Sequence, residues 1–332
     1  MKRTEEQQEF ERLTGRFGQD GIGATDIETL GANAKAGDPA AMREMAAAIA
    51  HVAFVSPGAS MAVLDNLTRG WVGESAALPG TPPAQLEMLA RLGEAERPDA
   101  AFWDRFWSFI DNRDGNMSGE EVTARVAGLA SNLPASFVGR AEKAAIAHPG
   151  TAGAENRALP PKLTLDVLGA QPEGSLGHDF YRLIVDNDFH LEVLDREETG
   201  LSDMPPALRY LNTRILQMHD VWHLMAGYRT TALQEVGISA FSLAQFDHSY
   251  SGMLIATAAT STLFNAPDAF PVVMQLIIEG WQHGRMTPSF MAIEWEQEWH
   301  RPIADIRTQY GIEAFTSIYP ADLVEQLRSA AA

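Results

Sequence analysis

Cysteine is absent from the 332 residues, so the chain has neither a disulfide framework nor thiolate ligands for a metal. Basic residues are few: 25 Lys and Arg stand against 44 Asp and Glu, which gives a formal net charge of -19. The field around so acidic a chain repels polyanions, and we therefore expect no nucleic-acid partner. Any metal that binds must be held by His, Asp or Glu.

Long apolar runs are also missing. The N-terminus, MKRTEEQQEFERLTG, lacks the apolar stretch of a secretory signal, so we expect a cytoplasmic protein without a cleaved targeting segment. Residues 249–267 are uncharged but rich in Ser and Thr, and the apolar tract 269–278 is short. Neither suits a membrane-spanning helix, which needs about 20 mainly apolar residues.

Apolar residues recur at helical spacing along most of the chain, and runs of alternating β-branched residues are missing. The sequence therefore predicts an all-α protein, with an N-terminal helical domain in addition to a bundle-like domain that carries a metal site. We expect helices at about 39–53, 83–95, 98–110, 118–131, 134–147, 176–186, 204–226, 231–247, 251–264, 268–282 and 288–310, the last kinked at Pro302.

A break in composition at 148–162, rich in Pro, Gly and Asn, separates two parts of the chain. We predict an N-terminal helical region, 1–150, of unassigned role and a metal-binding helical domain, 160–332. The turn at 112–118 has the first ligand positions of a calcium loop, but Met117 replaces the required glycine. A polar turn before a helix is the favoured interpretation.

The motif HDVWH, residues 219–223, is the strongest functional signal in the sequence. His219 and His223 lie four residues apart in a predicted helix, so both imidazoles can reach one ion. Glu235 follows eleven residues after His223, one turn into the next predicted helix, which Thr231 and Gln234 are expected to cap. Asp220 could ligate the same metal or orient His223 from behind.

Two other interpretations of this motif stay open. Two histidines four apart are often one packed and one surface residue, and the pattern also resembles the HExxH motif of zinc proteases. The aspartate at that position would withdraw the general base by about one methylene, which disfavours a peptidase. The spacing therefore suits a metal site of two histidines and one or two carboxylates, in which His219, His223 and Glu235 are candidate ligands and Asp220 is either a ligand or an orienting group.

HDVWH followed by eleven residues and a glutamate resembles the coenzyme Q biosynthesis protein 4 family. Further landmarks of that family follow in order: PEGSLG at 172–177, the GW and HG pairs around Trp281 and Gly284, and EWEQEWHRPIADIRTQYGI at 294–312. The resemblance covers about 160–315. It implies an all-α fold, a metal usually described as zinc on His219, Asp220, His223 and Glu235, and ubiquinone assembly on prenylated ring precursors. In such a site Asp220 and Glu235 are also the expected catalytic groups, since either could move a proton. The chemistry implied is loss of the ring carboxyl at C1 with hydroxylation of that carbon.

Two hypotheses follow, with a third of lower rank. The first is a metal-dependent decarboxylase of ubiquinone biosynthesis, with zinc as the expected ion and iron or manganese as alternatives that a site of histidines and carboxylates also accepts. The second is a metal-stabilised, lipid-binding scaffold for other ubiquinone-biosynthesis enzymes. The third is a metallohydrolase unrelated to quinones.

The expected partners are a prenylated quinone precursor and other ubiquinone-biosynthesis enzymes. A peripheral contact with the inner face of the membrane and a homo-oligomer are compatible with the sequence. The apolar helices at 251–264 and 268–282 could line a channel for the prenyl tail or form ordinary core, and Arg307 is the residue we expect to meet a substrate anion.

Overall fold

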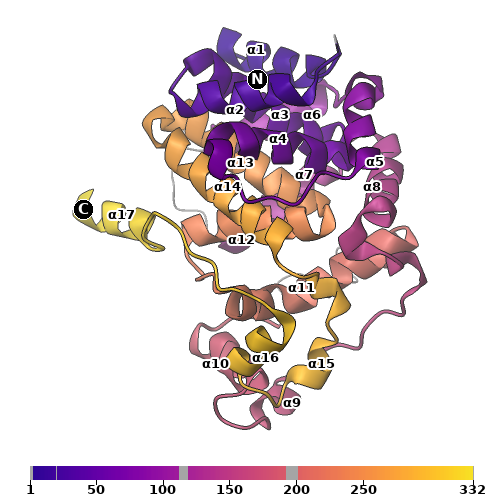
Figure 1. Ribbon diagram of the computed structural model, residues 1–332, viewed down its shortest axis with the longest axis vertical. Coiled ribbons are helices and arrows are strands. Elements are labelled where there is room, and N and C mark those ends of the chain that lie inside the picture. The colour runs from indigo at the N-terminus through magenta and orange to yellow at the C-terminus, as the bar shows by residue number, and fades with distance from the viewer. Residues whose placement is uncertain (1–2, 20, 112–118, 192–200, 332) are drawn as a thin grey trace. The chain divides into compact units, whose positions relative to one another are not determined.

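A computed structural model describes residues 3–19, 21–111, 119–191 and 201–331 (Figure 1). Every regular element in these ranges is helical, which confirms the predicted all-α class. None of the helices in this part of the chain has the length and apolar character that a membrane crossing requires. The predicted calcium-like turn at 112–118 lies outside the described residues.

The chain forms two compact units that do not follow chain order. Unit 1 consists of Met1–Ala144 together with Ser239–Met286, and unit 2 consists of Ala145–Ile238 together with Thr287–Ala332. The division passes through the helices α8 (Ala135–Ala147) and α12 (Ala232–Phe246). Division of the sequence into 1–150 and 160–332 stays a prediction about domains.

Unit 1 contains most of the long helices and one short helix, α5 (Pro83–Leu86). Besides parts of α8 and α12, the long ones are α1 (Glu5–Arg16), α2 (Ala24–Lys35), α3 (Pro39–Phe54), α4 (Ser60–Val72), α6 (Ala100–Ile110), α7 (Gly119–Ala130), α13 (Ser249–Asn265) and α14 (Phe270–Met286). Short 3-10 turns are η1 (Pro57–Ala59), η2 (Gly73–Ser75), η3 (Glu87–Glu94) and η7 (Pro267–Ala269).

Unit 2 holds the candidate site and is built around one long helix, α11 (Pro206–Ala226). Its other helices are α9 (Leu165–Gly169), α10 (Leu176–Asp186), α15 (Trp295–Glu298), α16 (Ile303–Tyr310) and α17 (Leu323–Ala331). Its 3-10 turns are η4 (Pro149–Thr151), η5 (Ala154–Asn156), η6 (Leu201–Asp203) and η8 (Phe290–Ala292).

Helix α3 is the centre of unit 1. Asp38 caps it by accepting hydrogen bonds from the backbone N–H groups of Ala40 and Ala41, and Pro39 occupies the first turn, as the sequence predicts. From Met45 to Phe54 every side chain is buried. A helix that is apolar on all sides must be covered on all sides, and α3 packs against α1, α2, α4 and α13 (Figure 1).

The N-terminal helices also cover the apolar residues of α13 and α14. Phe264 on α13 makes edge contacts with Phe10 of α1 and Trp107 of α6, with ring centroids 5.8 and 5.0 Å apart. The two helices that could line a prenyl channel have apolar residues that are fully or almost fully buried: Met253, Ile255, Met274, Leu276 and Ile277. This burial favours core packing over a channel.

The prediction of a single helix at 288–310 is wrong. The segment instead contains η8, α15 and α16, and α16 begins directly after Pro302. Proline has no N–H for a helical hydrogen bond and disfavours helical geometry in the residue before it, so it ends the preceding turn and starts a new helix.

Candidate metal centre

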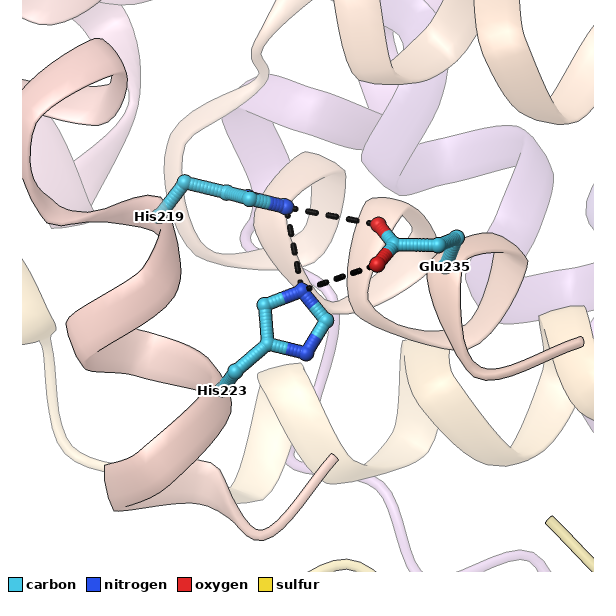
Figure 2. A group of neighbouring side chains, drawn as sticks. All are labelled: His219, His223 and Glu235. Carbon is cyan, nitrogen blue, oxygen red and sulfur yellow. Dashed lines mark hydrogen bonds and ion pairs between the residues drawn. The ribbon is translucent and has the colours of Figure 1, made fainter. Parts of the chain in front are cut away.

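His219, His223 and Glu235 converge on one point in unit 2 (Figure 2). The two histidines project from α11, which begins with Pro206 and ends at Gly227, a residue in the left-handed conformation with φ of 81°. Glu235 comes from the first turn of α12, which the turn at 227–231 brings back alongside the end of α11. The helix hairpin expected from the sequence thus assembles three of the four predicted ligands.

The spacing of these donor atoms suits one divalent ion. His223 Nε2 lies 3.1 Å from His219 Nε2 and 3.3 Å from Glu235 Oε1, and His219 Nε2 lies 3.4 Å from Glu235 Oε2. Donors about 2.0–2.1 Å from a tetrahedral zinc would be about 3.3 Å apart. Because the observed distances between donor atoms agree with this expected distance, the three side chains fit a metal without a change of backbone.

The proton positions support the same fit. His223 Nδ1 lies 3.3 Å from the carbonyl oxygen of Tyr228, which can only accept, so the geometry places a proton on Nδ1. Loss of the other ring proton leaves a lone pair on His223 Nε2, 3.3 Å from Glu235 Oε1. A bound cation could then accept this lone pair together with one from the Glu235 carboxylate.

Charges within the cluster shift the pKa of two of its members. Burial disfavours the charged form of His219, but the hydrogen bond and charge of Glu235, with a further contribution from Asp220, raise the pKa of His219 above its ordinary value. Burial likewise opposes ionisation of Glu235, yet the charge of His223 and the hydrogen bonds from both histidines hold its pKa well below 4.5. The site thus favours an ionised carboxylate beside nitrogen donors.

Exposure differs among the three residues. The side chain of His223 is 2% exposed, whereas those of His219 and Glu235 are 31% and 41% exposed. The cluster is therefore most enclosed at His223 and partly exposed at the other two residues.

Asp220 does not join this cluster. Residues adjacent in a helix point about 100° apart, and the half-buried Asp220 carboxylate is not among the ligand atoms that converge. Its charge nevertheless acts on His219. The group that contacts His223 Nδ1 is the Tyr228 carbonyl, which spacing in the sequence could not identify because a backbone oxygen has no residue signature.

The predicted cap of α12 differs from the structure. Thr231 donates its hydroxyl hydrogen to Ala321 O, and Gln234 Oε1 accepts from the Arg229 N–H, so the predicted Thr231–Gln234 capping box does not form. Arg307 donates from Nε to Met225 O and from Nη2 to Leu224 O, at 2.9 and 2.8 Å. Its guanidinium thus binds the last carbonyls of α11, and its contact with a substrate anion stays a prediction.

Comparison with known proteins places this cluster within a recognised segment. Residues 157–316 match the family model described as coenzyme Q (ubiquinone) biosynthesis protein Coq4. The mitochondrial ubiquinone biosynthesis protein COQ4 homolog of Rattus norvegicus is 30% identical over 153 residues, which are 45% of this chain and 55% of that protein. The Homo sapiens homolog is 28% identical over 153 residues, 46% and 56% of the two chains.

A solved structure of a candidate ubiquinone biosynthesis protein from Nostoc punctiforme aligns with 64% of this chain and 97% of its own. Its identity is 26% and its TM-score is 0.48. The chain spans about half the length of the curated relatives it matches. The resemblance to the Coq4 family is thereby confirmed for residues 157–316, the segment that carries His219, His223 and Glu235.

Proposed function

We propose that this protein acts in ubiquinone biosynthesis on a prenylated aromatic acid, with a divalent metal held by His219, His223 and Glu235. The reaction proposed is decarboxylation, coupled to oxidation, at ring carbon C1. The observation that carries the proposal is the convergence of three donors at metal-ligand spacing within the segment that matches the Coq4 family. The assignment to ubiquinone biosynthesis rests on the names of the similar proteins, which are ubiquinone biosynthesis protein homologs.

Two histidines and one carboxylate suit more than one ion. Zinc sites of catalytic proteins use the same donors, and non-haem iron sites with open positions do so too. Replacement of a ring carboxyl by hydroxyl releases carbon dioxide and removes two electrons from the ring, so an oxidant of the dioxygen class must take part. Zinc cannot exchange electrons, and this reaction would therefore favour iron or manganese over the zinc expected from the resemblance.

The metal would supply a positive charge that stabilises negative charge developing on the substrate oxygens. The residues of the chain do the rest. Glu235 and His219, the exposed members, border the side from which a substrate carboxylate would approach. Asp220 lies beside His219 without entering the cluster, and we assign it the transfer of a proton to or from the ring.

The test is elemental analysis of the purified protein and of His223→Ala, together with profiling of quinone intermediates in cells that carry each. His300→Ala is the matched control, since His300 is exposed and lies in the same unit. We expect His223→Ala to lose a stoichiometric metal and ubiquinone while a carboxylated prenyl-phenol accumulates. The control should keep both.

The same experiment separates the alternatives. If the metal is lost but ubiquinone is still made, the site is structural and the scaffold hypothesis replaces the enzyme. Turnover by the purified protein without other biosynthetic enzymes would exclude a scaffold as the whole account. Cleavage of an ester, peptide or phosphoester by the metal-loaded protein would favour the hydrolase. Contacts with other enzymes, with a membrane or with a second copy stay predictions.

A further inference from the structure

The C-terminal strap, residues 311–325, runs against the turn that joins α11 to α12 in unit 2. Its Phe315 N–H donates to the carbonyl of Ala226 at 2.7 Å, and the Phe315 ring stacks on Tyr228 with centroids 4.2 Å apart. The approach is close: a Cβ atom added to Gly227 would lie 3.0 Å from Ala314 Cβ. The strap therefore restricts the position of the turn directly after His223.

The stack on Tyr228 bears on the orientation of His223. The Tyr228 carbonyl is the partner of His223 Nδ1, and that contact leaves Nε2 as the ligand atom. A partner on the second ring nitrogen of a metal-binding histidine selects its tautomer and ring orientation. Phe315 contacts this arrangement at two points, the ring of Tyr228 and the backbone carbonyl of Ala226.

The far end of the strap holds the helix that carries Glu235. Glu325 Oε1 accepts a hydrogen bond from the backbone N–H of Ala232 at 3.1 Å, and Thr231 is tied to Ala321. Glu325 thus takes the part of an N-cap residue, which satisfies one of the free N–H groups and places a negative charge at the positive end of the helix. Glu235 lies three residues after Ala232, in the same turn.

We infer that Phe315 and Glu325 are positioning residues of the His219–His223–Glu235 cluster, Phe315 acting through Tyr228 on His223 and Glu325 acting through Ala232 on Glu235. This inference rests on the proposed metal site. Glu325 lies beyond residues 157–316, so this support comes from a part of the chain outside the family match. Phe315 thus supports the end of α11, which carries the two histidines, and Glu325 supports the start of α12, which carries Glu235.

The test measures metal affinity rather than turnover. Metal-free protein is titrated with Co²⁺, whose visible absorption reports the number and arrangement of ligands, and Zn²⁺ affinity is measured in competition with a chelator. We expect Phe315→Ala and Glu325→Ala each to weaken binding roughly tenfold and to change the Co²⁺ spectrum. Glu325→Gln keeps an accepting oxygen and should bind within about twofold of the unaltered protein.

Two controls separate positioning from a general loss of structure. Leu327→Ala alters a side chain of α17 that is 61% exposed, and it should leave affinity unchanged. In a protein that already carries Glu235→Ala, the further change Glu325→Ala should not alter the residual metal affinity. Glu325 acts on the metal only by positioning Glu235, which this protein lacks. Phe315→Ala should behave in the same way when added to His223→Ala.

The outcomes are distinct. If the unaltered protein binds neither ion, the proposed metal site itself is wrong. If it binds both and the Phe315 and Glu325 variants bind equally well, only the positioning role is wrong. Equal losses with and without the ligand substitutions would show a general structural effect and would also overturn the inference.

Discussion

The buried carboxyl group of Asp247 should make the stability of unit 1 depend on pH. It follows the end of α12 in the left-handed conformation, with φ of 50°, and is 7% exposed. Its Oδ1 atom is buried without a hydrogen-bond partner. Burial raises the pKa of Asp247 from 3.8 to about 7, although a hydrogen bond from Ser60 acts in the opposite direction.

The substitution Asp247→Asn replaces the ionisable carboxyl group by a neutral amide of nearly the same shape. Asparagine also tolerates the left-handed conformation, so the backbone need not change. As pH rises, the Asp247 carboxyl loses its proton at a lower pH in the unfolded chain than in the folded protein, because folding raises its pKa. The folded protein therefore loses stability as pH rises from about 4 to about 7. Three pKa units correspond to about 4 kcal/mol at 1.36 kcal/mol per unit, reached above that pH.

The assay is urea unfolding followed by circular dichroism at a series of pH values from 4 to 9. We expect the free energy of unfolding of Asp247→Asn to exceed that of the unaltered protein by an amount that grows with pH and levels off above about 8. Asp268→Asn, at an exposed position of unit 1, is the control and should show no such trend. A difference that is constant with pH, or that shrinks as pH rises, would refute the reasoning.

Four further predictions concern unit 1 and use the same unfolding assay. Burial lowers the pKa of His51 to about 4, so the unaltered protein should lose stability as pH falls from 6.5 towards 4, and the stability gap to His51→Gln should narrow over that range. Gly70→Ala should destabilise by more than about 2 kcal/mol, because its Cβ would lie 1.8 Å from a backbone oxygen of α2. Gly128→Ala, with open space around the new Cβ, should instead stabilise α7 by about 0.5–1 kcal/mol. Asp65→Asn removes the charge that pairs with the buried guanidinium of Arg285 at 3.0 Å and should cost about 3–5 kcal/mol, and a loss under about 1 kcal/mol would contradict this account.

Local patterns in the sequence determined the helices and the first half of the site. The Asp38–Pro39 start of α3, the end of α11 at Gly227 and the placing of His219 and His223 on one helix all follow from rules that act within one or two turns. Such signals need no knowledge of the rest of the fold, because capping and helical periodicity involve neighbours in the chain.

Tertiary packing decided the other features. The sequence indicated that Glu235 would return to the histidines, but the stacking of Phe315 on Tyr228 and the cap from Glu325 involve a segment that lies about 90 residues further on. The break of the 288–310 helix and the burial of α13 beneath N-terminal aromatics were likewise decided by contacts remote in sequence. Side-chain packing and backbone acceptors leave no periodic signal, so only the folded chain shows which of them meet.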